Sequence, residues 1–212
     1  MSRKIGVLAI QGSFYEHVKA FEALKEDIDV VQVRSASQLT HDLQGLVIPG
    51  GESTTIGHFL RKDNFLEKIK GWLNSPNDLK YAWGTCAGLI LLADELHNEK
   101  AGGQCKIGGI AINAFRNSYG RQKESCEQVV ILKNDQLRNC IGGKGNGLFQ
   151  GVFIRAPKIM EILDNSNTKI LAETESAEIV AVWQDNLMAT SFHPELTDDL
   201  RFHKFFADLL LR

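Results

Sequence analysis

The 212-residue sequence lacks paired cysteines, long hydrophobic runs and an excess of charge of either sign. Its four cysteines, Cys86, Cys105, Cys126 and Cys140, show no C-x-x-C spacing. The sequence therefore indicates neither a zinc site nor a disulfide framework, and a reducing compartment is the simplest setting.

Charge is balanced, with 24 basic residues against 26 acidic ones and a formal net charge of −2. These charges are scattered along the chain, so we expect no nucleic-acid partner. The first apolar stretch, Ile5–Ile10, is too short for a signal-peptide core or a membrane span. We therefore expect a cytoplasmic protein that does not enter a membrane.

No linker-like segment separates the motifs, and 43% of the residues are hydrophobic, enough for one substantial core. We expect a single domain over residues 1–212. Strands and helices alternate in the first half, which predicts an α/β fold with a doubly wound, mixed but mostly parallel sheet flanked by helices, as in flavodoxin-like proteins.

The expected elements fall into three groups. The first strands are Lys4–Ile10, Val30–Val33, Leu46–Ile48 and Tyr81–Gly84, with helical patterns at Phe14–Lys25 and Ile56–Leu73 between them. The region Ile107–Leu187 is mostly strand-like and should extend or flank the sheet, with strands at Gln128–Leu132, Gly151–Ile154, Ile170–Ala172, Glu178–Trp183 and Leu187–Ser191. An apolar stripe from Phe202 to Leu210 predicts a final packed helix.

The segment Gly84-Thr85-Cys86-Ala87-Gly88 lies between a predicted strand and an apolar run, as a nucleophile elbow does. Gly84 and Gly88, two residues on either side of the thiol, have no β-carbon, so the backbones of the strand and the following helix can approach each other closely. The start of the following helix also favours a thiolate. The alternative is a small buried cysteine between two tightly packed glycines.

A base and a carboxylate occur together in His193-Pro194-Glu195. In an extended backbone, residues two apart point to the same side, so Glu195 can orient the imidazole that takes the Cys86 proton. The alternative is a turn followed by a helix, whose amino end Glu195 would favour.

A glycine pair, Gly50-Gly51, follows a buried strand and precedes Glu52-Ser53. Backbone N–H groups of this loop, with that of Ala87, form a candidate oxyanion hole. Ser53 is at the same time the expected cap of the next helix.

These motifs resemble the class I, or triad-type, glutamine amidotransferases, and most closely the glutaminase subunits of pyridoxal 5′-phosphate synthase. The segments that carry the resemblance are Ile5–Gly12, Pro49–Thr55, Trp83–Leu89, Arg116–Gln122, Phe153–Pro157 and Ser191–Leu196. The resemblance implies a triad of Cys86, His193 and Glu195 that hydrolyses glutamine without a metal or cofactor.

The same resemblance implies further site residues. Glutamine would be held by Gly51, Glu52, Ser53, Arg116, Ile154 and Arg155, and the oxyanion by Gly51 and Ala87. Arg116 suits the α-carboxylate of free glutamine and Glu52 its α-ammonium. The family also implies a (β/α)₈-barrel synthase partner that receives the ammonia, with Gln11 and Gly12 in the coupling region.

Three alternatives remain open: a glutaminase serving another synthase, a hydrolase or chaperone-like member of the wider elbow-cysteine fold, and a non-catalytic scaffold subunit. The glycine-rich stretch 139–148 lacks phosphate-loop spacing, so we expect a surface loop there. The remaining histidines have no partner motif, and surface or helix-face positions are expected for His17, His41, His58, His97 and His203.

Overall fold

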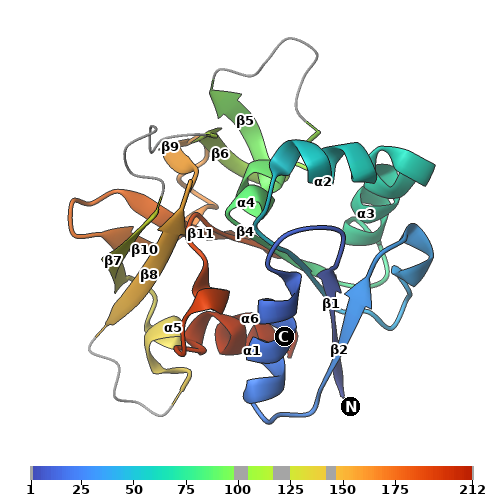
Figure 1. Ribbon diagram of the computed structural model, residues 1–212, viewed down its shortest axis with the longest axis horizontal. Helices are drawn as coiled ribbons and strands as arrows, with labels where there is room; N and C mark the ends of the chain where they lie inside the picture. The colour runs from blue at the N-terminus through green and yellow to red at the C-terminus, as the bar shows by residue number, and fades with distance from the viewer. Residues whose placement is uncertain (1, 98–104, 117–124, 142–146, 212) are drawn as a thin grey trace.

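A computed structural model describes residues 2–97, 105–116, 125–141 and 147–211 (Figure 1). Nine strands form its main sheet, in the order β2-β1-β3-β4-β12-β11-β10-β7-β8. They are β1 (Arg3–Leu8), β2 (Ile28–Val33), β3 (Gly45–Ile48), β4 (Tyr81–Thr85), β7 (Ser125–Leu132), β8 (Leu148–Ile154), β10 (Lys169–Thr174), β11 (Ile179–Gln184) and β12 (Leu187–Thr190).

The main sheet has two halves of different character. From β2 to β12 the neighbouring strands run parallel. From β12 to β8 every pairing is antiparallel. The predicted α/β class with a mixed sheet is confirmed, and the strand-rich second half extends the sheet as expected.

A second sheet of three short strands was not predicted. It has the order β5-β6-β9 and consists of β5 (Ala93–His97), β6 (Ile110–Phe115) and β9 (Lys158–Ile162). Strand β5 was missed because it follows α4 (Ala87–Leu92) without a turn, and the backbone becomes extended at Ala93, the last residue of the apolar run that forms the helix. Register shifts in both ladders blur the alternation that identifies a strand.

Helices cover both faces of the main sheet (Figure 1). Helices α1 (Phe14–Ala23), α5 (Asp135–Asn139) and α6 (Arg201–Leu209) share one core cluster, while α2 (Ser53–Leu60), α3 (Phe65–Leu73) and α4 share the other. Strand β3 shows the division: Val47 joins the first cluster and Leu46 and Ile48 join the second. A strand buried on both faces reads as a continuous apolar run, which is why β3 was predicted.

The predicted helix Ile56–Leu73 is wrong as one element. It is split into α2 and α3 by the short 3₁₀ turn η2 (Lys62–Asn64), in which Asp63 and Asn64 have φ values of 51° and 60°. Asp and Asn tolerate this left-handed conformation better than most residues, so the apolar periodicity continues across a break in the backbone. Helix α1 also ends earlier than predicted, at Ala23.

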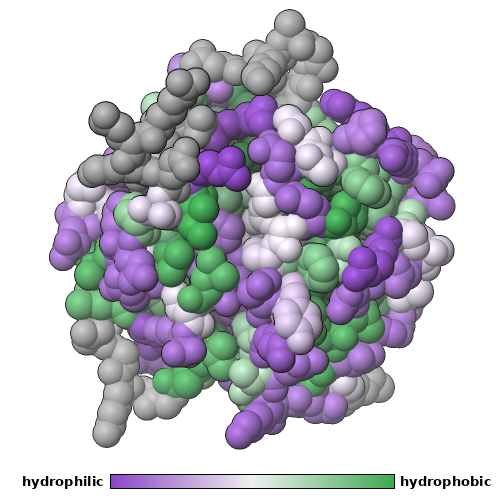
Figure 2. Space-filling view, viewed as in Figure 1, coloured by the Kyte–Doolittle hydropathy of each residue, from purple (hydrophilic) through white to green (hydrophobic). Residues whose placement is uncertain are grey.

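Two further short turns complete the described part of the chain. They are η1 (Ala36–Gln38) and η3 (Pro194–Leu196). No described helix combines the length and apolar composition needed to cross a bilayer. On the face drawn in Figure 2, residues of intermediate hydropathy gather at the centre, with hydrophobic residues on either side.

The core under α6 gives a test of this packing. Phe206 is fully buried and contacts the rings of Phe21 and Trp83. We expect Phe206→Ala to lower the free energy of unfolding by about 3–5 kcal/mol, because it removes buried apolar area and leaves a cavity. Chemical denaturation measures this change. The matched control is Phe59→Ala on α2, where the ring is 44% exposed and the expected change is below about 1 kcal/mol; equal losses would contradict the described core.

Candidate active site

The carboxyl ends of β1, β3, β4 and β12 lie at one edge of the sheet, because these neighbouring strands are parallel. Each is followed by a loop that contains predicted site residues. This is where ligands bind in open parallel sheets, at the point where loops leave the strand ends. The fold therefore brings together motifs that are more than a hundred residues apart in the sequence.

The turn from β4 into α4 has the geometry of an elbow. Cys86 has φ 48° and ψ −102°, an unfavourable conformation for a residue with a side chain. A Cβ placed on Gly84 would lie 2.4 Å from the Gly88 carbonyl, and one on Gly88 would lie 2.0 Å from the Ile48 oxygen. Only glycine fits either position, so the two glycines allow the close backbone approach that holds Cys86 in place.

The thiol of Cys86 is mostly buried but faces a pocket. The residue is 6% exposed, and its backbone N–H donates to the Thr190 carbonyl at 2.8 Å. Its Sγ lies 3.8 Å from the Ile154 carbonyl oxygen. Gly50 packs against both Cys86 and His193, since a Cβ there would lie 3.1 Å from the Cys86 Cβ and 2.3 Å from the His193 Cε1.

His193 and Glu195 contact each other directly. The Nδ1 atom of His193 lies 2.7 Å from the Glu195 Oε1 atom. The expected extended backbone is only partly correct, because Pro194 begins the 3₁₀ turn η3 immediately after His193. The turn anticipated as an alternative and the carboxylate-imidazole contact therefore occur together. Proline suits the first position of such a turn because it has no N–H to satisfy.

The electrostatics keep this pair charged. Burial opposes protonation of His193, but hydrogen bonds to Cys86 and Glu195 and their negative charge outweigh it and raise its pKa to about 10. Burial likewise opposes ionisation of Glu195, but the neighbouring ring nitrogens of His17 and His193 and the Ser13 hydroxyl lower its pKa to about 2. At neutral pH an imidazolium thus lies between the carboxylate and the Cys86 sulfur, ready to give up a proton.

Two residues at the start of α1 contact the Glu195 carboxylate and were not predicted. The Ser13 hydroxyl donates to Oε1 at 2.5 Å, and the His17 Nε2 atom lies 3.3 Å from Oε2. Of the expected surface or helix-face positions, a surface position is wrong for His17 and His203, which lie on α1 and α6 and are both fully buried. The spacing of Ser13 and His17, about one helical turn at the start of α1, shows that they lie on one face of the helix but not that this face meets Glu195.

The loop after β3 is held from two sides. The Gly50 N–H donates to the Thr85 hydroxyl at 3.0 Å, and the Glu52 N–H donates to the Gln11 side-chain oxygen at 2.8 Å. A Cβ on Gly12, whose φ is 91°, would lie 1.7 Å from the Gly50 oxygen. The expected coupling residues Gln11 and Gly12 therefore abut the expected oxyanion loop.

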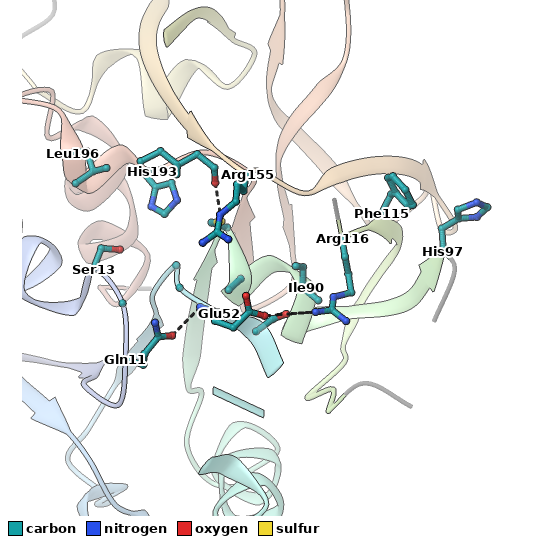
Figure 3. Close-up of a pocket in the computed structure, with 17 residues that line it drawn as sticks. Gln11, Ser13, Glu52, Ile90, His97, Phe115, Arg116, Arg155, His193 and Leu196 are labelled. Atoms are coloured by element: carbon teal, nitrogen blue, oxygen red, sulfur yellow. Dashed lines mark hydrogen bonds and ion pairs between the residues drawn. The ribbon is translucent and has the colours of Figure 1, made fainter. Parts of the chain in front are cut away.

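A pocket of about 510 Å³ lies between these loops (Figure 3). Of the predicted residues, its lining includes Gln11, Gly12, Gly51, Glu52, Ser53, Cys86, Ala87, Arg116, Ile154, Arg155 and His193. Glu195 lies behind His193 and does not line it. Gly50, from the predicted glycine loop, also lines it, whereas the sequence assigned no site role to the remaining lining residues, which are Ser13, Ile90, His97, Phe115 and Leu196.

The pocket lining includes side chains of both charges, Glu52, Arg116 and Arg155. Arg116 donates to the Ser53 Oγ at 3.1 Å and lies 3.8 Å from the Glu52 Oε1 (Figure 3). Hydrogen bonds from Thr54, together with Arg116 and Arg155, hold the pKa of Glu52 below its usual value despite partial burial. Arg155 itself has φ 43°, a sparsely populated conformation of the kind found at ligand sites.

Ser53 is not the helix cap that the sequence predicted. Glu52 is the N-cap of α2 and its carboxylate accepts from the Thr54 N–H, so Ser53 begins the helix and presents its hydroxyl to Arg116.

Two sequence features lie partly outside the described residues: positions 117–122 of the arginine-glutamine motif and 142–146 of the glycine-rich stretch.

A sequence model of the SNO glutamine amidotransferase family matches residues 7–211. The chain belongs to this family. It is therefore a glutamine amidotransferase, and the resemblance seen in its motifs is confirmed.

Individual relatives cover nearly the whole chain. The chain is 42% identical to pyridoxal 5′-phosphate synthase subunit PdxT of Herpetosiphon aurantiacus, over 97% of this chain and 99% of that protein. It is 37% identical to probable pyridoxal 5′-phosphate synthase subunit pdx2 of Dictyostelium discoideum, over 98% and 92% of the two chains. A crystal structure of a glutamine amidotransferase, 36% identical, superposes with a TM-score of 0.81 and covers 98% of this chain and 99% of that one.

The raised pKa of His193 gives a prediction. Glu195→Gln removes a negative charge that favours the imidazolium, so the His193 pKa should fall from about 10 towards its ordinary value. An NMR titration of the His193 ring measures the change. The control Glu67→Gln, at an exposed position of α3, should leave the titration as in wild type. An unchanged titration in Glu195→Gln would contradict the role of the carboxylate.

Proposed function

We propose that this chain is a single-domain glutaminase, over residues 1–212, that supplies ammonia for pyridoxal 5′-phosphate synthesis. It hydrolyses L-glutamine to L-glutamate and ammonia through Cys86, His193 and Glu195. The observation that carries this proposal is the contact between a strained, pocket-facing cysteine and an imidazole that is bound to a buried carboxylate. The names of the relatives add the synthase context.

In the proposed reaction, His193 holds the Cys86 proton, and the resulting thiolate attacks the side-chain amide carbon of glutamine and forms a tetrahedral intermediate. His193 gives its proton to the amide nitrogen, which leaves as ammonia when the carbon-nitrogen bond breaks. A glutamyl thioester remains. His193 then takes a proton from water, the resulting hydroxide attacks the thioester, and glutamate leaves as the carbon-sulfur bond breaks. Glu195 keeps its charge and orients the imidazole throughout.

Backbone donors of Gly51 and Ala87 are proposed to bind the oxyanion of the tetrahedral intermediate. Ala87 follows the nucleophile at the start of α4, and Gly51 belongs to the loop that Thr85 and Gln11 hold. One such donor typically contributes about 3 kcal/mol of transition-state stabilisation. Their positions in the pocket lining support this assignment.

Substrate binding is assigned to Gly51, Glu52, Ser53, Arg116, Ile154 and Arg155. Free glutamine carries a carboxylate and an ammonium group on its α-carbon. A pocket lined by two arginines, a glutamate and a thiol suits such a ligand. The planar Arg116 guanidinium is assigned to the carboxylate and Glu52 to the ammonium group.

The ammonia acceptor is proposed to be a partner, the (β/α)₈-barrel subunit of a pyridoxal 5′-phosphate synthase, in the cytoplasm. Two relatives are named as subunits of that synthase, and the chain spans nearly their full length. The proposed chemistry is complete with amino-acid side chains and water, so it needs no cofactor on this chain. Pyridoxal 5′-phosphate would be the product of the complex.

The decisive experiment measures glutamate release from glutamine by the purified chain, alone and with a barrel subunit of the synthase. We expect activity that rises when the barrel is added and that Cys86→Ala abolishes, because the sulfur is the nucleophile. The matched control is Cys126→Ala on β7, which should retain activity. Activity without any dependence on Cys86 would contradict the mechanism, and no activity in either condition would favour a scaffold.

Partner-dependent activation gives a second prediction. The Gln11 side chain holds the Glu52 N–H, so Gln11→Ala should loosen the loop that the partner is proposed to order. We expect the ratio of activities with and without the barrel to fall about fivefold or more, within the usual range of coupling between sites. The control Gln150→Ala, exposed on β8, should leave this ratio unchanged. An unchanged ratio in Gln11→Ala would rule out the coupling role.

A further inference from the structure

Two fully buried histidines lie behind the candidate triad and line no part of the pocket. His17 comes from α1 and His203 from α6, and the Nδ1 atom of His17 is 2.9 Å from the Nε2 atom of His203. The His203 ring packs edge-on against Phe21 and Trp83. Buried imidazoles in an apolar core are costly unless their nitrogens have partners, so their contacts require an explanation.

The other end of this pair reaches the triad. The His17 Nε2 atom lies 3.3 Å from the Glu195 Oε2 and 3.2 Å from the Thr85 Oγ1. Ser13 and His193 both contact Oε1, whereas Oε2 is buried and has no hydrogen-bond donor among the described residues. His17 is therefore the polar group that faces the second oxygen of the carboxylate.

Two observations determine where the protons lie. Burial lowers the pKa of both rings, so each is neutral and carries one proton. A lone pair on the His17 Nε2 would face the negative carboxylate, whereas a proton there stabilises it. The His17 Nδ1 then accepts from the His203 Nε2–H.

The far end of the pair supports the same arrangement. The His203 Nδ1 is buried and has no partner among the described residues. If His17 donated to His203, the proton of His203 would lie on this Nδ1 and form an orphaned buried N–H, which is rare in proteins. With His203 as the donor, its Nδ1 carries a lone pair that accepts no hydrogen bond, and no N–H is left without an acceptor.

The His17 Nε2 atom also contacts the oxyanion loop indirectly, through the Thr85 hydroxyl. The Thr85 hydroxyl oxygen accepts the Gly50 N–H at 3.0 Å and has a second lone pair for the His17 Nε2–H. Thr85 precedes Cys86, so this hydroxyl joins the elbow, the glycine loop and α1. His17 therefore contacts the carboxylate and, through Thr85, the loop that carries the proposed oxyanion donor.

We propose that His203 and His17 form a directed chain of hydrogen bonds that ends on the Thr85 hydroxyl, which accepts the Gly50 amide, and that places the His17 Nε2–H beside the Glu195 carboxylate, making His17 a positioning residue of the glutaminase reaction. This inference rests on the proposed function. Because His17 lies outside the pocket, its loss should lower kcat and leave KM for glutamine nearly unchanged.

Two substitutions of His17 separate this role from simple packing. The Gln side chain in His17→Gln can place an amide N–H near the Nε2 position, whereas the shorter Asn in His17→Asn reaches only the Nδ1 position. With the barrel subunit present, we expect His17→Asn to lose about 10- to 100-fold in kcat, as supporting contacts of functional groups commonly do. His17→Gln should stay within about threefold of wild type, because it keeps the donor.

The control is His41→Asn, the same change at a histidine whose side chain is 86% exposed; it should keep the wild-type kcat. Thermal unfolding is recorded for each variant. Equal kcat losses in His17→Asn and His17→Gln, in proportion to lost stability, would show a packing role and overturn the inference. So would a wild-type kcat in His17→Asn.

Nitrogen-15 NMR of histidine-labelled full chain tests the proton positions without any activity, and therefore remains decisive if the His17 variants do not fold. We expect the proton on Nε2 in both His17 and His203, and a mixture of His17 tautomers in His203→Phe, which keeps a ring but removes the donor. A proton on the His17 Nδ1 would overturn the chain of hydrogen bonds. A wild-type complex without glutaminase activity would instead overturn the proposed function, whatever the tautomer.

Discussion

The candidate site depends on how closely four loops approach one another at the carboxyl edge of the parallel strands. Gly88 lies so near the Ile48 carbonyl, and Gly12 so near the Gly50 carbonyl, that a single added carbon would overlap a backbone oxygen. These contacts leave each loop almost no freedom to move independently. Because interiors at this density transmit displacements, the positions of thiol, imidazole and glycine loop are set jointly.

A second constraint is the burial of a charged carboxylate. Removing Glu195 from water costs several kcal/mol, and His193 and Ser13 offset this cost by satisfying one of its oxygens. Both contacts come from N-cap residues, His193 before η3 and Ser13 before α1. The carboxylate is held so firmly that it works as a fixed charge, and its effect is expressed in the raised pKa of His193.

The sequence predicted those parts of the site that are encoded locally. The Gly84–Gly88 elbow and the Gly50-Gly51 loop are each contained in a few residues, and buried strands such as β3 are apolar throughout. What it could not predict arises from contacts between distant segments. Ser13 is 182 positions from Glu195, and nothing near it in the sequence marks it as a donor to a carboxylate.

Local patterns also misled where backbone conformation changed without a change in composition. The apolar run after Cys86 is helical to Leu92 and extended from Ala93, and the periodicity of α2 continues into α3 across the break at Asp63. In both places tertiary contacts decide the conformation. The small sheet fixes β5 through pairing with β6, which lies outside the window that sequence patterns cover.

The loop from β1 to α1 contacts both the proposed oxyanion loop and the triad carboxylate, although it contributes no group to the proposed covalent steps. The Ser13 N–H donates to the Gly50 carbonyl and its hydroxyl donates to Glu195, while Gln11 holds the Glu52 amide. A displacement of residues 11–13 therefore moves the proposed oxyanion loop and releases the carboxylate together. Since these residues lie at the rim of the pocket, a partner bound there would act on both with a single contact, which is the simplest physical route from docking to a competent site.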